Sequence, residues 1–294
     1  MNTAQVLPQL FMSGIVIGSI YSLIALGFVI IYKATKILNF AQGELLMFGA
    51  YIFFVLSVDL KIPYIFAFLL TLTFAFLLGI SLELFLFRKM MGQPVFSLIM
   101  ITIGLSNVLR SLAAFIWGDM DMVALPSPLP MKPVKILGAS LTYPQILTIT
   151  AMVVMFALFA LFFRVTRMGT AIRASCDDQD AAALTGVNIN RVFQLAWIMA
   201  AVVACVGGIF LGHINYLHIS MGFIAIRVFP AIILGGMESI TGAVLGGLII
   251  GVAENMAGGL IESGLQDVTA YIVLILVLII RPYGFFGEKE IERI

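Results

Sequence analysis

The sequence contains little charge, and this scarcity excludes most soluble folds. Only 11% of its 294 residues are charged, whereas 62% are hydrophobic, and the mean hydropathy is +1.14. A soluble domain of this length carries about twice that share of charged residues. Several apolar runs also reach the roughly 20 residues that a helix needs to cross a bilayer. The composition therefore predicts an all-α, polytopic membrane protein in which residues 1–294 form a single transmembrane domain.

Cysteine and clustered basic residues are also scarce. The two cysteines, Cys176 in a polar loop and Cys205 in an apolar run, predict no disulfide framework and are interpreted as small packing residues. A formal net charge of +1 without a basic patch argues against nucleic acid as a partner. His213 and His218 are five positions apart, which is not the spacing of zinc ligands on a helix. We therefore expect no metal site.

Motifs for ATP binding and catalysis are missing as well. The chain contains no Gly-Lys dipeptide, so a Walker A loop is excluded. The acidic run Asp177-Asp178-Gln-Asp180 has no second acidic motif to pair with, and we interpret it as a helix start instead of a metal–diphosphate site. No paired catalytic motif occurs, so we expect neither enzymatic activity nor a bound cofactor in this chain.

Basic residues follow alternate apolar runs and predict an orientation. Lys33 and Lys36 follow the first run, Arg88 and Lys89 follow the third, and Arg164 follows the fifth. Because lysine and arginine concentrate in cytoplasmic loops, these ends are predicted to be cytoplasmic and the N-terminus to be outside. The predicted spans cover residues 9–32, 44–58, 62–87, 94–117, 144–163, 192–214, 240–260 and 268–280.

One short segment leaves the number of spans open. Residues 222–236, interrupted by Arg227 and Pro230, are marginal for a crossing. If this segment crosses, the chain has nine spans and a cytoplasmic C-terminus, and if it re-enters, the chain has eight. We favour nine. Residues 118–143 contain four prolines and are predicted to form an extended external loop.

The longest polar interruption, residues 164–191, contains four arginines and three aspartates and is predicted to be cytoplasmic. A short amphipathic helix is expected within it, with an ordinary solvated loop as the alternative. Asp177 or Asp178 can cap the start of this helix, and Asp180 supplies an acidic first turn. Ala181 and Ala182 are small helix formers, and Gly186 suits a left-handed helix end.

Three charged residues fall within predicted spans, where charge is costly and is usually paired or functional. Glu83 lies about one turn from Arg88 and Lys89, so it is predicted either to snorkel toward that end of its span or to pair there. Arg110 and Glu254 lie at similar predicted depths and have opposite signs, which predicts a buried ion pair. In the alternative, these two residues and Asn107 line the path of a zwitterionic solute.

Glycine patterns predict close helix contacts. Gly14, Gly18 and Ser22 recur along one face of the first span, which predicts a small-residue packing surface. Gly235 and Gly236 interrupt a late apolar run. They are interpreted either as a packing site or as a break in a helix whose end faces a substrate carboxylate on the translocation path.

Several runs resemble the membrane subunits of ABC importers. Asp180-Ala-Ala-x-x-x-Gly186 resembles the Glu-Ala-Ala-x-x-x-Gly core of their cytoplasmic loop, with Asp in place of Glu and without the Ile-x-Leu-Pro tail. Residues 21–51, which include the run Asn-Phe-Ala-Gln-Gly-Glu, resemble the high-affinity branched-chain amino-acid permeases, as do residues 167–174 and 231–247. Together these runs span nearly the whole chain.

The resemblance implies an ABC-importer permease fold and a permease subunit in the bacterial inner membrane that translocates branched-chain amino acids or similar small zwitterions. It implies as partners a second permease of similar fold, two ATP-binding subunits that hydrolyse ATP, and a periplasmic substrate-binding protein. In that family the cytoplasmic loop docks on the ATPase, and this role is expected here for Arg173, Asp177, Asp178, Asp180, Ala181, Ala182 and Gly186. The alternatives are an ABC permease for urea or amides and a stand-alone secondary transporter or channel for a small polar solute.

Overall fold

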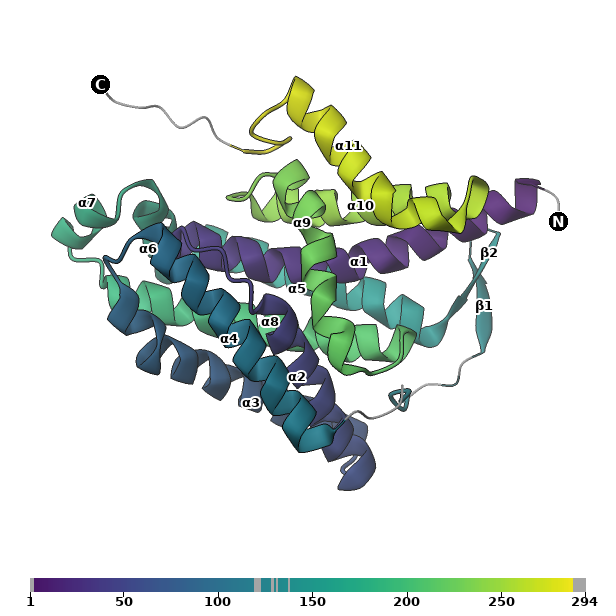
Figure 1. Ribbon diagram of the computed structural model, residues 1–294, viewed down its shortest axis with the longest axis horizontal. Coiled ribbons are helices and arrows are strands. Elements are labelled where there is room, and N and C mark those ends of the chain that lie inside the picture. The colour runs from purple at the N-terminus through teal and green to yellow at the C-terminus, as the bar shows by residue number, and fades with distance from the viewer. Residues whose placement is uncertain (1–2, 119–122, 128–129, 131, 137, 288–294) are drawn as a thin grey trace.

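The chain is almost entirely helical over the part that the structure describes. A computed structural model describes residues 3–118, 123–127, 130, 132–136 and 138–287 (Figure 1). The longer helices are α1 (Thr3–Thr35), α2 (Gln42–Phe54), α3 (Tyr64–Phe85), α4 (Val95–Trp117), α5 (Tyr143–Val165), α8 (Ile189–Ile214), α9 (Ile224–Gly235), α10 (Ile240–Leu260) and α11 (Gln266–Ile280). Two short helices, α6 (Arg167–Asp177) and α7 (Gln179–Leu184), separate α5 from α8, and an antiparallel hairpin of β1 (Pro133–Ile136) and β2 (Ala139–Thr142) precedes α5.

Local signals set several helix ends. Pro63 and Pro94 directly precede α3 and α4, where a missing backbone N–H costs no helical hydrogen bond. Gly118, with a φ of 69°, follows the last residue of α4. At the start of α5, the Gln145 side chain accepts a hydrogen bond of 2.9 Å from the Thr142 N–H. The apolar runs thus form helices whose limits the sequence itself encodes.

Within the described ranges, seven helical segments are long and apolar enough to cross a membrane, and two apolar helices are shorter. The seven cover residues 6–35, 42–59, 64–90, 95–117, 143–165, 189–214 and 240–260, and the shorter two cover 219–235 and 268–280. This total agrees with the predicted eight to nine spans. Residues 222–236, for which the sequence allowed either a crossing or a re-entrant segment, contain α9. Its 12 residues extend only about 18 Å at ~1.5 Å per residue.

The centre of the bundle is formed by α1 and α8, which pack against each other and against α2, α3 and α10 (Figure 1). Trp197 of α8 is fully buried and stacks on Phe87, with ring centroids 3.8 Å apart. In contrast, α3, α4 and α5 each have an exposed side of large apolar residues, among them Phe66, Phe115 and Leu161. Such faces suit contact with hydrocarbon instead of water.

Glycines let α1 and α10 approach each other closely. A Cβ atom at Gly18 would lie 2.8 Å from the Leu248 Cα. One at Gly247 would lie 2.5 Å from the Ser22 backbone nitrogen. The Ser22 hydroxyl also donates a hydrogen bond of 2.8 Å to the Val244 carbonyl. The predicted small-residue surface on the first span is therefore confirmed, and it packs against α10.

The helices α2 and α9 both begin inside the bundle. Gln42, the first residue of α2, donates a hydrogen bond of 3.1 Å to the carbonyl of Ala200, which lies near the middle of α8. Helix α9 follows a 3₁₀ turn, Ile219–Phe223, that packs against α2. The far end of α2 reaches the end of α8, where the rings of Phe53 and His213 are 6.0 Å apart. The far end of α9 instead packs on the start of α10, so the two helices diverge toward opposite ends of the bundle.

We predict that Gly18→Ala destabilises the protein by about 1–3 kcal/mol, because the added methyl group collides with the α10 backbone. Gly207→Ala is the matched control, since a Cβ atom there would meet the Leu23 Cβ at an ordinary 3.6 Å. Thermal unfolding of the detergent-solubilised variants, followed by fluorescence-detected size-exclusion chromatography, measures the difference. Equal melting temperatures for the two variants would contradict the close α1–α10 contact.

Candidate functional site

The starts of α2 and α9 meet at two glycines. A Cβ atom at Gly43 would collide with the Gly222 carbonyl oxygen, and one at Gly222 would lie 3.1 Å from the Glu44 Oε1. Side chains at these positions would hold the two backbones apart. Because a helix is electropositive at its N-terminus, two positive helix ends face one region in the middle of the bundle.

Three polar side chains at the start of α2 are buried, namely Asn39, Gln42 and Glu44. The Asn39 Oδ1 accepts a hydrogen bond of 3.1 Å from the Ala41 N–H, and its Nδ2 donates one of 3.2 Å to the Gln42 Oε1. These bonds tie the chain that enters α2 to the helix itself. They also satisfy polar groups that would be costly to leave unpaired in a membrane interior.

Glu44 forms an ion pair with Arg110 of α4. The Glu44 side chain is only 2% exposed, and that of Arg110 is 26% exposed. Glu44 lies in the first turn of α2, where the helix dipole favours a carboxylate. The Arg110 guanidinium carbon lies 3.9 Å from the centroid of the Phe223 ring, a cation–π contact. One charged pair therefore joins α2, α4 and the start of α9.

The predicted ion pair between Arg110 and Glu254 is wrong. Glu254 is buried on α10 and accepts a hydrogen bond of 2.7 Å from the Tyr21 hydroxyl. The prediction compared depths along two helices, and depth does not determine which helix faces meet. Glu44 was missed because it was assigned to the surface end of a predicted span. The signal that points to it is a polar run, residues 39–44, followed by an unusually short apolar run.

The predicted pairing of Glu83 is confirmed. Its two carboxylate oxygens accept hydrogen bonds of 2.8 and 2.9 Å from the Arg88 Nε and Nη2. Glu83 is fully buried and Arg88 is 37% exposed, so this pair resembles Glu44–Arg110 in composition and burial. It lies at the end of α3, away from the junction of α2 and α9.

A cavity of about 280 Å³ opens beside the Glu44–Arg110 pair. Its wall combines this pair with Asn107, Ile103 and Phe223, together with backbone and side chains from the start of α9. The Arg110 Nε is buried and has no hydrogen-bond partner among the described residues. The cavity thus presents both signs of charge within otherwise apolar walls. It contains Arg110 and Asn107, two of the residues that the sequence placed on a translocation path.

Gly235 and Gly236 lie at the opposite end of α9 from this cavity. Gly236 has a φ of 96° and ends the helix. The N–H groups of Phe285 and Phe286 donate to the carbonyls of Leu234 and Gly235 at 2.8 and 3.2 Å, so the chain after α11 caps α9. It is therefore the start of α9, and not this glycine break, that faces the charged cavity. The packing interpretation of the two glycines is the one that the contacts support.

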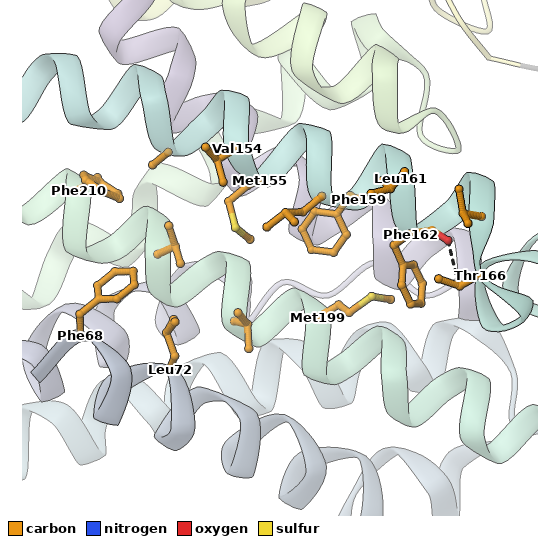
Figure 2. Close-up of a pocket in the computed structure, with 15 residues that line it drawn as sticks. Phe68, Leu72, Val154, Met155, Phe159, Leu161, Phe162, Thr166, Met199 and Phe210 are labelled. Carbon is orange, nitrogen blue, oxygen red and sulfur yellow. Dashed lines mark hydrogen bonds between the residues drawn. The ribbon is translucent and has the colours of Figure 1, made fainter. Parts of the chain in front are cut away.

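A larger cavity, of about 780 Å³, lies among α3, α5 and α8 and is almost wholly apolar. Figure 2 shows Phe68, Leu72, Met155, Phe159 and Met199 turned toward it, and the one hydrogen bond drawn there joins Thr166 to the Phe162 carbonyl. Such a lining offers no partner for a polar or charged solute. The smaller, charged cavity is therefore the better candidate for a functional site.

The polar loop folds into two helices at one end of the bundle (Figure 1). Thr166 caps α6 by accepting a hydrogen bond of 2.9 Å from the Gly169 N–H. A Cβ atom at Gly169 would lie 2.7 Å from the Phe163 Cα, so glycine lets α6 fold back on the end of α5. Arg173 donates to the Phe163 carbonyl and fastens the two helices together. Hence the loop is anchored on α5 by its first helix.

The second helix of the loop, α7, matches most of its sequence signals. Asp178 accepts a hydrogen bond of 2.9 Å from the Ala181 N–H, which makes it the cap, whereas Asp177 is the last residue of α6. Gly186 has the expected positive φ, of 90°. Ala182 is only 4% exposed and faces the protein. The apolar side chain that α7 exposes is Leu184, at 90%.

No group of three or more His, Cys, Asp or Glu side chains comes together within the described part of the chain in a way that could hold a metal ion. His213 is instead bound through its ring nitrogens to backbone carbonyls of Ile209 and Pro126, at 2.6 and 3.1 Å. In the polar loop, Asp178 caps α7, and Asp177 and Asp180 are exposed surface charges.

We predict that Arg110→Ala and Glu44→Ala each destabilise the protein by about 3–5 kcal/mol, because each leaves a buried charge without its partner. The double variant should recover part of that loss. The pair Arg110→Ala and Glu254→Ala should give additive losses, since these residues do not meet. Thermal unfolding in a double-mutant cycle tests this, and coupling of Arg110 to Glu254 instead of Glu44 would contradict the structure.

Comparison with known proteins places the chain in one family. The family described as "Branched-chain amino acid transport system / permease component" matches residues 10–280. The chain is 35% identical to the high-affinity branched-chain amino acid transport system permease protein BraD of Pseudomonas aeruginosa, over 97% of each chain. It is 34% identical to the LivH permease protein of the same kind of system in Escherichia coli K12, over 98% of this chain and 97% of that one. A probable LivH permease of Methanocaldococcus jannaschii is 26% identical over 95% of this chain and 93% of that one. The chain therefore belongs to the family of branched-chain amino acid transport permeases, the membrane subunits of ABC systems.

Proposed function

We propose that this chain is the permease subunit of an ATP-driven importer that moves branched-chain amino acids across the bacterial inner membrane. Similarity to BraD and LivH over nearly the full length of each chain supports the transported class. The observation that carries the proposal is the charged cavity at the meeting point of α2 and α9. Discontinuous helices whose N-termini face a polar site near mid-membrane are a common design of solute transporters.

A second permease of similar fold covers the polar face of α4. Asn107 and Ser111 are exposed on this helix although the helix is long enough to span the membrane. A Cβ atom at Gly104, on the same face, would meet nothing within 4 Å. Polar side chains in a membrane helix face the protein or a water-filled path instead of lipid, and small residues allow close helix contact. The translocation path then runs between the two permeases, past the charged cavity.

ATP hydrolysis takes place on two separate ATP-binding subunits, and α7 is the segment that meets them. Leu184 is 90% exposed at the end of a six-residue helix, so it can insert into a cleft on a partner. Movement of α7 is transmitted through α6, which Arg173 fastens to the end of α5. Rigid-body shifts of α5 and its neighbours then open or close the path. A periplasmic binding protein delivers the amino acid from the other side.

We predict that Leu184→Glu weakens the association with the ATP-binding subunits by about tenfold or more, because it places a charge in an apolar contact. The spans do not touch this side chain, so the variant should reach the membrane at the wild-type level. Co-purification with the ATP-binding subunits and ATP turnover stimulated by the loaded binding protein measure the effect.

The matched control for this experiment is Leu60→Glu, at an exposed leucine in the turn between α2 and α3 at the other end of the bundle. It should leave ATPase association unchanged. Wild-type association of Leu184→Glu would show that α7 is an ordinary solvated helix. A chain that transports leucine without any ATP-binding subunit would instead favour a secondary transporter.

The proposed orientation places the N-terminus outside and the C-terminus in the cytoplasm. We predict that a membrane-impermeant maleimide labels Lys135→Cys in intact cells, because Lys135 is exposed on the predicted external hairpin. Cys176, on the cytoplasmic loop, should be labelled only after the cells are permeabilised. Labelling of Cys176 in intact cells would reverse the orientation.

The reactivity of Cys176 gives this experiment an internal check. Burial raises the pKa of the Cys176 thiol above its usual value, although the nearby Lys36 and Lys33 charges oppose this. Maleimides react with the thiolate, whose fraction at neutral pH is lowered by the raised pKa. In permeabilised cells, labelling of Cys176 should therefore accelerate as the pH is raised toward the pKa. Lack of labelling in intact cells therefore indicates a cytoplasmic location only if permeabilised cells are labelled at the same pH.

A further inference from the structure

We propose that the cavity beside Glu44 and Arg110 is a binding site for the α-amino and α-carboxylate groups of the transported amino acid. The inference rests on the proposed function and names the residues that meet the substrate. Arg110 and the electropositive starts of α2 and α9 receive the carboxylate, and Glu44 receives the ammonium group. The apolar wall receives the side chain.

The charges of the cavity match those of a zwitterion. Glu44 supplies one negative charge and Arg110 one positive charge, and both line the same space. An amino acid that enters between them can exchange the protein's ion pair for two ion pairs with the substrate, so no charge is left alone in a low-dielectric interior. A neutral amide or urea offers no such exchange. A solute with one charge would leave either Glu44 or Arg110 unpaired.

Arg110 is placed to accept such a ligand. Its Nε is buried without a hydrogen-bond partner among the described residues, which leaves a donor available on one edge of the guanidinium. Its face is held on the Phe223 ring, with 3.9 Å between the guanidinium carbon and the ring centroid. A planar guanidinium fixed in this way binds a carboxylate through two parallel hydrogen bonds. The stacking therefore orients Arg110 for a carboxylate that approaches from the cavity.

The size and the apolar wall of the cavity suit a single aliphatic amino acid. Its volume is about 280 Å³, just below the range of roughly 300–1,000 Å³ typical of sites for drug-sized ligands. Ile103, Ile226 and Phe223 contribute hydrophobic surface next to the charged pair. A branched aliphatic side chain gains transfer free energy against such a wall, whereas a polar side chain loses its hydration there.

The pair of Glu83 and Arg88 shows what a purely structural pair looks like in the same chain. There the arginine binds both carboxylate oxygens through two good hydrogen bonds, at 2.8 and 2.9 Å. At the junction of α2 and α9, by contrast, Arg110 contacts Glu44 through a single nitrogen, and its Nε has no hydrogen-bond partner among the described residues. This difference provides the control for an experimental test.

The first test measures leucine transported per ATP hydrolysed by the complete importer, reconstituted in vesicles with its binding protein. The double variant Glu44→Gln with Arg110→Gln keeps both side chains polar and leaves no lone charge. We expect leucine transport per ATP to fall by about tenfold, while ATP turnover stimulated by the loaded binding protein persists. The matched variant Glu83→Gln with Arg88→Gln should keep the wild-type ratio. An unchanged ratio in the first variant would overturn the proposal.

A second test needs neither charged residue to be replaced. Asn107→Cys in a Cys176→Ala background places a thiol on the cavity wall, and its rate of modification by a methanethiosulfonate reagent reports occupancy. We expect leucine to slow the reaction, and expect 4-methylpentanoate and isoamylamine, which each lack one of its two charges, not to do so. Equal effects of all three, or none from leucine, would refute zwitterion binding. If the wild-type importer fails to accumulate leucine at all, the proposed function fails instead.

Discussion

A carboxylate buried at the middle of the bundle constrains the surrounding structure. Glu44 is 2% exposed in a chain whose long helices are mostly apolar, and its charge would be costly there without compensation. The compensation comes from Arg110 on α4 and from the N-terminus of α2 itself. Bringing these groups together requires α2 to begin inside the bundle, and this in turn requires glycines at 43 and 222 so that the two helix starts can meet. The helix starts inside the bundle and the Glu44–Arg110 pair therefore depend on each other.

Small residues also allow close helix contact elsewhere in the bundle, since α1 packs on α10 at Gly14, Gly18 and Ser22. In lipid, helices gain nothing from hiding apolar surface from water, so close backbone packing and hydrogen bonds must supply the association. Helix α1 therefore links α8 and α10, since it packs against both. Helix α6 contacts α1, α5 and α8, so the polar loop is joined to the bundle at several points.

Sequence reasoning succeeded where a signal is local and failed where two distant segments meet. The Glu83–Arg88 pair, the cap of α7 and the positive φ of Gly186 depend on residues a few positions apart, and the sequence predicted the positive φ and narrowed the other two to a pair of alternatives each. The partner of Arg110 is 66 positions away, and depth alone pointed to Glu254 on the wrong helix. Likewise, the polar run 39–44 marks a break before a short apolar run, but it does not show that these residues lie inside the bundle. The coupling role of the loop residues stays a prediction.

The capping of α9 by the chain after α11 has a consequence for the order in which the protein assembles. The last carbonyls of α9 accept hydrogen bonds from Phe285 and Phe286, which the ribosome adds some fifty residues later. Until then, the C-terminal end of this short helix has no such partners, although its start already abuts α2. The helix that borders the charged cavity is therefore completed only when synthesis of the chain is nearly finished. A permease released before that point would contain all of its long spans and still lack a finished α9.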